Sequence, residues 1–217
     1  MIVDERMITF INSLDTKNSE ILEDIEREAL ADNVPIIRRE MQSFLKVLLM
    51  VKKPMRVLEV GTAVGFSALL MSEYVPEECA ITTIENYEKR IPIARQNFVR
   101  AGKEKKITLL EGDAMDVLKT LEGPYDFIFM DAAKGQYIHY LPEILRLLAK
   151  GGILVSDNVM QDGDVIESRF AVERRDRTIH ARMREYLYEL KHNDALVTSI
   201  IPLGDGVALS VKKEVGT

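Results

Sequence analysis

The spacing of hydrophobic and polar positions divides this chain into two parts near residue 53. Up to that point the apolar side chains recur at helical spacing, with no strand-like alternation. One predicted helix begins at the cap-forming run Asn18-Ser19-Glu20 and is broken at Asn33-Val34-Pro35. A second has a core-facing stripe of Met41, Phe44, Leu45, Leu48 and Leu49. This helical cap, residues 1–53, is expected to cover a sheet edge or meet a second subunit; alternatively, its segment 36–39 closes over an active site.

From residue 54 onward, strand-like and helix-like patterns alternate, which is typical of a parallel sheet with right-handed crossovers. The candidate strands are Arg56–Val60, Ala80–Ile84, Lys106–Leu110, Phe127–Met130 and Ile153–Val155. The helical patterns between them cover Ser67–Tyr74, Arg90–Ala101, Ala114–Leu121 and Tyr137–Ala149. The last two apolar segments, Val197–Pro202 and Val207–Lys212, predict an antiparallel hairpin at the sheet edge. We therefore predict an α/β, Rossmann-like fold: one domain over residues 1–217, with a mostly parallel seven-stranded sheet and a core over 54–217.

Composition narrows the class of protein. The chain has 217 residues, of which 47% are hydrophobic, enough for one α/β domain with a substantial core. A net charge of -6 argues against a general polyanion binder, although a local basic face could hold a structured nucleic acid. The single cysteine, Cys79, excludes an intrachain disulfide. Because the start, Met1–Arg6, is charged too early for a signal peptide and no apolar run spans a bilayer, we expect a cytoplasmic protein without membrane contact.

The run Arg56–Ser67 joins a buried-strand pattern to a glycine turn that enters a helix. Gly61 and Gly65 let the backbone approach a ligand closely, and the helix start offers unpaired N–H groups. The run differs from the dinucleotide fingerprint because Ala63 replaces the middle glycine and Glu59 lies just upstream. A buried carboxylate would repel a pyrophosphate and suit a cationic ligand such as S-adenosylmethionine, which carries a sulfonium and an ammonium. The alternative is a strand–helix turn without a ligand.

A polar residue follows each later strand, at the sheet edge where open α/β folds bind ligands. Glu85 follows the second strand, where an acidic side chain can accept hydrogen bonds from ribose hydroxyls. Asp113 follows the third and could accept from an adenine amino group. Asp131 ends the fourth strand, and Asp157-Asn158 end the fifth. Each alone is more commonly an N-cap or turn residue, but their recurrence at successive strand ends favours a site.

Asp131, Asp157 and Asn158 offer two carboxylates and an amide oxygen, an incomplete oxygen shell suited to Mg²⁺. Lys134, three residues after Asp131, is either a solvated loop lysine or a base. The three histidines lack metal-ligand spacing and are interpreted as structural or surface residues. Farther along, the arginines from Arg169 to Arg184 form either a salt-bridged surface or a phosphate-contacting patch.

Three segments together resemble the cation-dependent O-methyltransferases related to catechol and caffeoyl-CoA O-methyltransferases. They are Leu58–Ser67, Asp131–Tyr137 and Asp157–Val159, and the resemblance extends over nearly the whole chain. Within this family, Asp131–Tyr137 and the ending Ile201–Ser210 are most similar to the bacterial tRNA 5-hydroxyuridine methyltransferases. The resemblance implies an S-adenosylmethionine-dependent methyltransferase fold, a homodimer, and conversion of 5-hydroxyuridine at the tRNA wobble position to 5-methoxyuridine.

The same resemblance implies three sets of site residues. The set for S-adenosylmethionine is Ile37, Glu59, Gly61, Ser67, Glu85, Asp113, Ala114 and Asp131. The set for Mg²⁺ or another divalent cation is Asp131, Asp157 and Asn158. The catalytic pair is Lys134, which matches the family's proposed base, and Asp131. One departure is Ala132-Ala133, which replaces bulkier or acidic residues of the plant and animal enzymes, so their phenolic specificity does not carry over.

The chemistry of the acceptor links these sets. A catechol presents two adjacent oxygens that chelate Mg²⁺, and 5-hydroxyuridine presents a similar pair in its C5 hydroxyl and C4 carbonyl. Chelation favours the oxyanion and fixes it in line with the methyl group. We therefore expect a tRNA anticodon loop as partner and S-adenosylmethionine as the small-molecule methyl donor. The alternatives are an O-methyltransferase of a small catechol-like phenol and a catalytically silent S-adenosylmethionine-binding module; the missing middle glycine disfavours a dehydrogenase.

Overall fold

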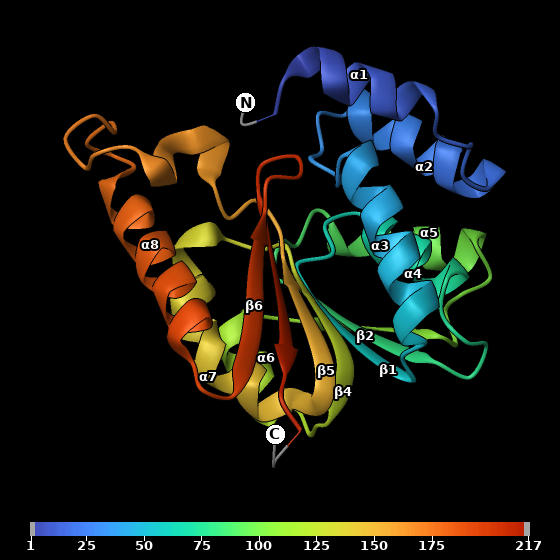
Figure 1. The fold of residues 1–217 in the computed structure, drawn as a ribbon. Helices are drawn as coiled ribbons and strands as arrows, with labels where there is room; N and C mark the ends of the chain where they lie inside the picture. The colour runs from blue at the N-terminus through green and yellow to red at the C-terminus, as the bar shows by residue number, and fades with distance from the viewer. Residues whose placement is uncertain (1–2, 215–217) are drawn as a thin grey trace.

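A seven-stranded sheet with the strand order β3-β2-β1-β4-β5-β7-β6 forms the centre of the molecule (Figure 1). The computed structural model describes residues 3–214; the ends of the predicted domain, 1–2 and 215–217, lie outside the described residues. The strands are β1 Arg56–Val60, β2 Ala80–Glu85, β3 Ile107–Glu111, β4 Tyr125–Met130, β5 Leu148–Ser156, β6 Leu196–Ile201 and β7 Val207–Lys212. β1 to β5 pair in parallel, and β7 is antiparallel to both β5 and β6. The predicted mostly parallel sheet with an antiparallel C-terminal hairpin is therefore confirmed.

Helices cover both faces of the sheet (Figure 1). They are α1 Glu5–Ser13, α2 Glu20–Ala31, α3 Arg39–Lys52, α4 Phe66–Glu73, α5 Ile91–Arg100, α6 Ala114–Thr120, α7 Tyr137–Leu147 and α8 Arg177–His192, with short 3-10 helices η1 Lys134–Gln136 and η2 Gln161–Ile166. Side chains alternate along β4: Phe127 and Phe129 join the core formed with α2 to α5, whereas Ile128 and Met130 join the core under α6 to α8. Because both faces are covered, the central strands are apolar on both sides.

One predicted boundary is wrong by several residues. The helical pattern Tyr137–Ala149 predicts a helix through Ala149, followed by a strand from Ile153, but α7 ends at Leu147 and β5 begins at once at Leu148. Leu148 is buried and pairs with Tyr125 of β4. Sheet pairing and burial therefore outweigh the helical spacing there. The other predicted strands and helices begin and end close to the observed ones.

Parallel pairing brings the residues after β1, β4 and β5 together. Val60 pairs with Met130, and Met130 pairs with Ser156. The backbone hydrogen bonds continue one residue beyond the strands, since Asp131 N donates to Val60 O at 3.0 Å and Asp157 N donates to Met130 O at 2.9 Å. The strand ends are thereby fixed side by side, as the sheet topology predicts.

None of the helices in the part of the chain from 3 to 214 has the length and apolar character needed to cross a membrane.

Candidate active site

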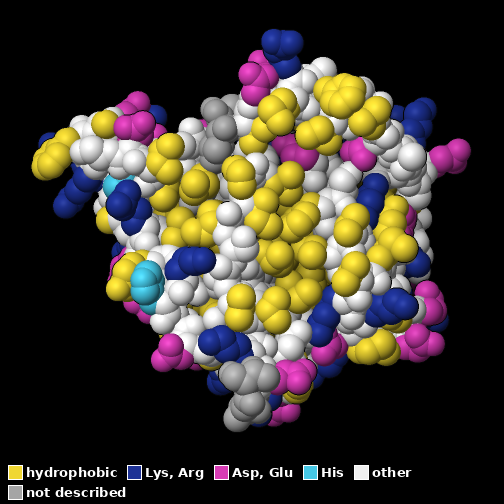
Figure 2. All heavy atoms as spheres, viewed as in Figure 1, with side chains coloured by type: hydrophobic (Ala, Val, Ile, Leu, Met, Phe, Trp, Pro, Cys, Tyr) yellow, Lys and Arg dark blue, Asp and Glu magenta, His cyan; other side chains and the backbone are white. Residues whose placement is uncertain are grey.

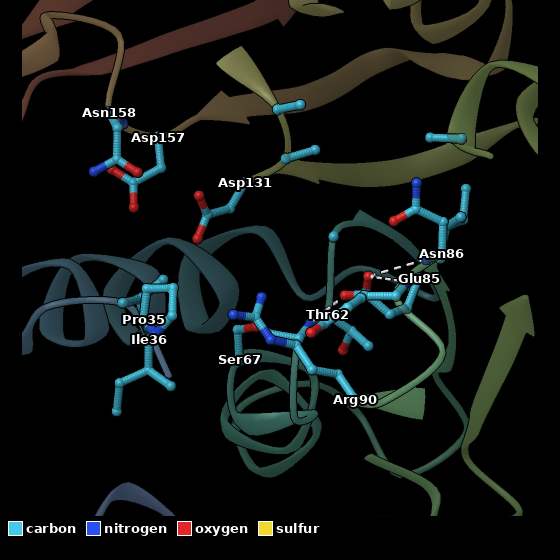
Figure 3. Close-up of a pocket in the computed structure, with 18 of the residues that line it drawn as sticks. Pro35, Ile36, Thr62, Ser67, Glu85, Asn86, Arg90, Asp131, Asp157 and Asn158 are labelled. Atoms are coloured by element: carbon cyan, nitrogen blue, oxygen red, sulfur yellow. Dashed lines mark hydrogen bonds between the residues drawn. The ribbon is translucent and has the colours of Figure 1, made fainter. Parts of the chain in front are cut away.

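A cavity of about 560 Å³ lies between the carboxyl ends of the strands and the segment that joins α2 to α3. Figure 3 shows Asp131, Asp157 and Asn158 at one end of it and Glu85 and Asn86 toward the other. Its walls therefore come from segments far apart in the sequence, and its two ends differ in chemistry.

Gly61, directly after β1, lines the cavity and lets two backbone segments pass close together there. Its φ is +93°, and a Cβ at this position would collide with the backbone carbonyl of Asp131. A glycine is therefore required for the turn after β1 to pass beside the end of β4.

At one end, Glu85 is held by backbone N–H groups. Its carboxylate accepts from Ala63 N at 2.7 Å, from Asn86 N at 3.0 Å and from Tyr87 N at 2.9 Å (Figure 3). A carboxylate has about four acceptor positions, so it retains capacity for a ligand hydroxyl. The carboxylate is buried and fixed in place, and its predicted contact with a ribose stays a prediction.

Glu59 lies behind this wall rather than in the cavity lining. The side chain is 0% exposed, and its two oxygens accept hydrogen bonds from Ser67 Oγ and Thr83 Oγ1, each at 2.5 Å. Burial raises the pKa of Glu59 to about 7, while the hydrogen bond from Ser67 opposes the rise. Ser67 does line the cavity, so its hydroxyl links the cavity wall to this carboxyl group.

At the other end, oxygen atoms converge on one cationic group. Lys134 Nζ lies 2.7 Å from Asp131 Oδ1 and 2.7 Å from Asn158 Oδ1. Asp157 is 5% exposed, and its Oδ1 accepts from Asn158 N at 2.7 Å. Burial, followed by the charge of Asp131, raises the pKa of Asp157 to about 7.

The donor set at this end fits a hard divalent cation. Within residues 3–214 no three His, Cys, Asp or Glu side chains group as a metal site, so the candidate ligands at this end are the two aspartates together with the amide oxygen of Asn158. Carboxylate and amide oxygens are the ligands that Mg²⁺ prefers, with water completing the shell. Because Asp131 and Asn158 already bond one ammonium group, their oxygens lie within reach of a common cation.

Most of the predicted site residues line this one cavity. They are Ile37, Gly61, Ser67, Glu85, Ala114, Asp131, Lys134, Asp157 and Asn158. Glu59 and Asp113 do not. Asp113 is the N-cap of α6, and its carboxylate accepts from Met115 N at 2.8 Å, so it has the capping function weighed for it in the sequence. Its contact with adenine stays a prediction.

Several cavity residues were not identified from the sequence. They include Pro35, Thr62, Asn86, Tyr87, Arg90 and Tyr140. Asn86 and Tyr87 directly follow Glu85, so the strand-end rule could have included them. Tyr140 gives no such signal, because it lies inside α7 and its spacing is that of a core residue.

The matching family model, two sequence relatives and one similar solved structure all describe methyltransferases. The model of the O-methyltransferase family matches residues 12–213. The catechol O-methyltransferase of Niastella koreensis is 35% identical over 128 residues, which cover 57% of this chain and 58% of that enzyme. Caffeoyl-CoA O-methyltransferase 2 of Populus trichocarpa is 33% identical over 183 residues, or 76% of this chain and 70% of that one. The crystal structure of an SAH-bound methyltransferase of Podospora anserina has a TM-score of 0.87 at 27% identity, covering 97% of this chain and 95% of that chain.

Proposed function

This chain belongs to the O-methyltransferase family, and on that premise we propose that it transfers a methyl group from S-adenosylmethionine to the 5-hydroxyl of 5-hydroxyuridine at the tRNA wobble position. The observation that carries the proposal is the convergence of Asp131, Asp157, Asn158 and Lys134 at one end of a cavity whose other end holds Glu85. One end suits an acceptor with two adjacent oxygens, and the other suits a nucleoside donor.

S-adenosylmethionine supplies the electrophilic methyl group when bound. In the proposed mode, Glu85 accepts hydrogen bonds from its ribose hydroxyls, and Ser67 faces its methionine part with the carboxyl group of Glu59 behind. The buried negative charge of an ionised Glu59 favours a ligand that carries an ammonium and a sulfonium. Ile37 closes the cavity from the α2–α3 segment, and its carbonyl accepts from Gln42 Nε2 at 3.0 Å, so α3 fixes this segment.

At the acceptor end, Asp131, Asp157 and Asn158 would hold a divalent cation, which when bound lowers the pKa of the acceptor hydroxyl and orients its neighbouring carbonyl. Lys134 lies beside these ligands, 24% exposed in its side chain, and reaches the same oxygens. We assign it the role of taking or guiding the acceptor proton beside Asp131. The protein thus contributes positioning and proton transfer.

The segment between β5 and α8 supports an RNA acceptor. Phe170 is 85% exposed and Ile166 is 67% exposed. Among the described residues, Arg169 and Arg174 make no ion pair, whereas Arg175 pairs with Glu173 at 3.0 Å. An exposed aromatic ring beside unpaired guanidinium groups suits stacking on a splayed base and contact with phosphates. A small phenol would need neither the exposed ring nor the unpaired guanidinium groups.

A small catechol-like phenol is the second candidate acceptor. It is favoured by the catechol and caffeoyl-CoA O-methyltransferases among the relatives, because those names describe phenolic substrates. Both candidates present two adjacent oxygens, so the cation end of the cavity suits either one.

The experiment that separates them compares acceptors under identical conditions. Initial rates of methyl transfer are measured with tRNA bearing 5-hydroxyuridine, with the same tRNA carrying unmodified uridine, and with a catechol. We expect transfer to the first, none to the second, and a much lower kcat/KM for the catechol. Efficient transfer to the catechol with none to either tRNA would establish the small-molecule function instead.

We further propose that two copies of the chain pair through an apolar face. Figure 2 shows hydrophobic side chains gathered over β6, β7 and the neighbouring helix α3. In α3, Val47 and Val51 are 61% and 77% exposed, and Val197 of β6 is 62% exposed. β6 is also an edge strand, so its outer backbone groups are open to pairing. In sedimentation velocity, Val51→Glu with Val197→Glu should convert a dimer to monomer; a wild-type monomer would refute the pairing.

A further inference from the structure

Tyr137 is a buried residue with an unusually central hydroxyl group. It begins α7, is 0% exposed, and its ring packs edge-on against the ring of Tyr186, with centroids 5.4 Å apart. Its hydroxyl lies under the acceptor end of the cavity but is absent from the cavity lining. A ligand therefore does not touch it, and any effect on the reaction must pass through its neighbours.

Those neighbours are the segments that carry the candidate cation ligands. Tyr137 Oη accepts from Ala132 N at 3.3 Å and donates toward Met130 O at 3.0 Å, so it contacts the backbone on both sides of Asp131. It also lies 3.2 Å from the carbonyl oxygen of Asp157. A hydroxyl has one proton, so Met130 O and Asp157 O share it, and this shared bond joins the end of β4 to the end of β5.

The same hydroxyl also meets the proposed base. Lys134 Nζ lies 3.4 Å from Tyr137 Oη, in addition to its contacts with Asp131 and Asn158. A single side chain thus touches the segments of both aspartates and the lysine. The Tyr186 hydroxyl bonds the side chain of Ser156, the residue before Asp157, but among the described residues it has no hydrogen bond to the segment of Asp131 or to Lys134.

We propose that Tyr137 is a positioning residue whose hydroxyl sets the spacing of Asp131, Asp157 and Lys134, and thereby determines how tightly the site binds a divalent cation. The inference rests on the proposed function, because it takes these aspartates as cation ligands. Partners that orient metal ligands without touching the metal have large effects on affinity. The Tyr137 ring packs in the core, whereas its hydroxyl group holds the ends of β4 and β5 at a fixed distance from each other.

Tyr186 supplies a matched control. It is also 0% exposed, lies against Tyr137, and has its hydroxyl 2.6 Å from Ser156 Oγ. Tyr186→Phe and Tyr137→Phe each remove one buried, hydrogen-bonded hydroxyl and leave the ring in place. The two changes differ in which segments lose their link: the ends of β4 and β5 for Tyr137, and the side chain of Ser156 for Tyr186.

The test measures binding of Mn²⁺ alone to the full chain by isothermal titration calorimetry and by the loss of the free-ion EPR signal. We expect Tyr137→Phe to weaken Mn²⁺ binding by about tenfold or more and Tyr186→Phe to change it by less than about twofold. Thermal unfolding midpoints should show that both variants are folded at the temperature of the titration. Wild-type affinity in Tyr137→Phe, or equal weakening in both variants, would overturn the inference and leave the proposed function intact.

A second measurement needs no change at Tyr137. Wild-type protein carrying ¹³Cζ-tyrosine is titrated with Mg²⁺, and the Tyr137 resonance is identified by replacing each other tyrosine in turn. We expect the Tyr137 resonance to shift on Mg²⁺ binding while that of Tyr186 stays in place. Mg²⁺ binding without a shift at Tyr137 overturns the inference alone, whereas a wild-type chain that binds neither ion overturns the inference together with the proposed cation site.

Discussion

Replacing Glu59 by Gln tests the electrostatics behind the cavity wall. The carboxyl group is 0% exposed, and the groups within residues 3–214 that affect its pKa are hydroxyls and a carboxylate rather than cations: Ser67 Oγ and Thr83 Oγ1 each lie 2.5 Å from one of its oxygens. Burial therefore raises its pKa from 4.5 to about 7. Glutamine keeps the shape of the side chain and can bond both hydroxyls, but its amide group does not ionise.

The sign and size of the effect follow from linkage. Between pH 4.5 and about 7 the unfolded chain ionises Glu59 while the folded chain keeps it protonated, so unfolding releases a proton. The free energy of unfolding therefore falls as the pH rises through this window. At 1.36 kcal/mol per pKa unit the full effect is roughly 3 kcal/mol, most of which lies between pH 5 and 8.

The assay is urea unfolding, followed by circular dichroism at several pH values in EDTA. Wild type should lose roughly 2 kcal/mol or more of unfolding free energy beyond the loss of Glu59→Gln between pH 5 and 8, whatever constant offset the substitution adds. Ser67→Ala removes the hydrogen bond that holds the pKa of Glu59 down, so it should move the window to higher pH. Parallel pH profiles for wild type and Glu59→Gln would refute the reasoning, because they would mean that Glu59 is ionised throughout.

Three further predictions concern other parts of the chain. Gly61→Ala should destabilise the fold by at least about 2 kcal/mol in urea unfolding, because the methyl group meets the Asp131 carbonyl at a φ of +93°; wild-type stability would contradict the close approach. The double variant Arg169→Glu with Arg174→Glu should raise the KM for tRNA about tenfold and leave catechol methylation unchanged. Arg27→Glu, a remote control, should change neither. Equal loss of activity on both acceptors would argue against an RNA-contacting segment. Cys79 is 2% exposed and burial raises the pKa of its thiol to about 11, so the native protein should not react with a thiol reagent until urea unfolds it; rapid labelling of the native chain would show that the thiol is accessible.

The sheet and the grouping of site residues could be predicted because both depend on local pattern plus topology. Short apolar runs gave strands such as β1, whose observed bounds, Arg56–Val60, match the predicted ones. Once the strands are parallel, their carboxyl ends share one edge, so Asp131 and Asp157 were expected at the same edge of the sheet. The pairing of β4 with β5 in the folded chain then makes them neighbours.

Other features depend on contacts that a single sequence does not encode locally. Asp113 suits a helix cap or an adenine contact equally well by residue type, and its hydrogen bond to Met115 N appears only in the folded chain. Tyr137 has the spacing of a core residue, and its role emerges only when the ends of β4 and β5 meet its hydroxyl. The early start of β5 likewise depends on the pairing of Leu148 with a distant strand.

The most direct test of the central claim follows the methyl group itself. tRNA bearing 5-hydroxyuridine is incubated with the chain, S-adenosylmethionine carrying a deuterated methyl group, and Mg²⁺, and its nucleosides are identified by mass spectrometry. Parallel reactions contain EDTA or the Asp157→Ala variant. We predict deuterated 5-methoxyuridine in the complete reaction and its loss in both controls. Equal product in the presence of EDTA would contradict the cation dependence, and no methylated nucleoside in the complete reaction would contradict the tRNA substrate.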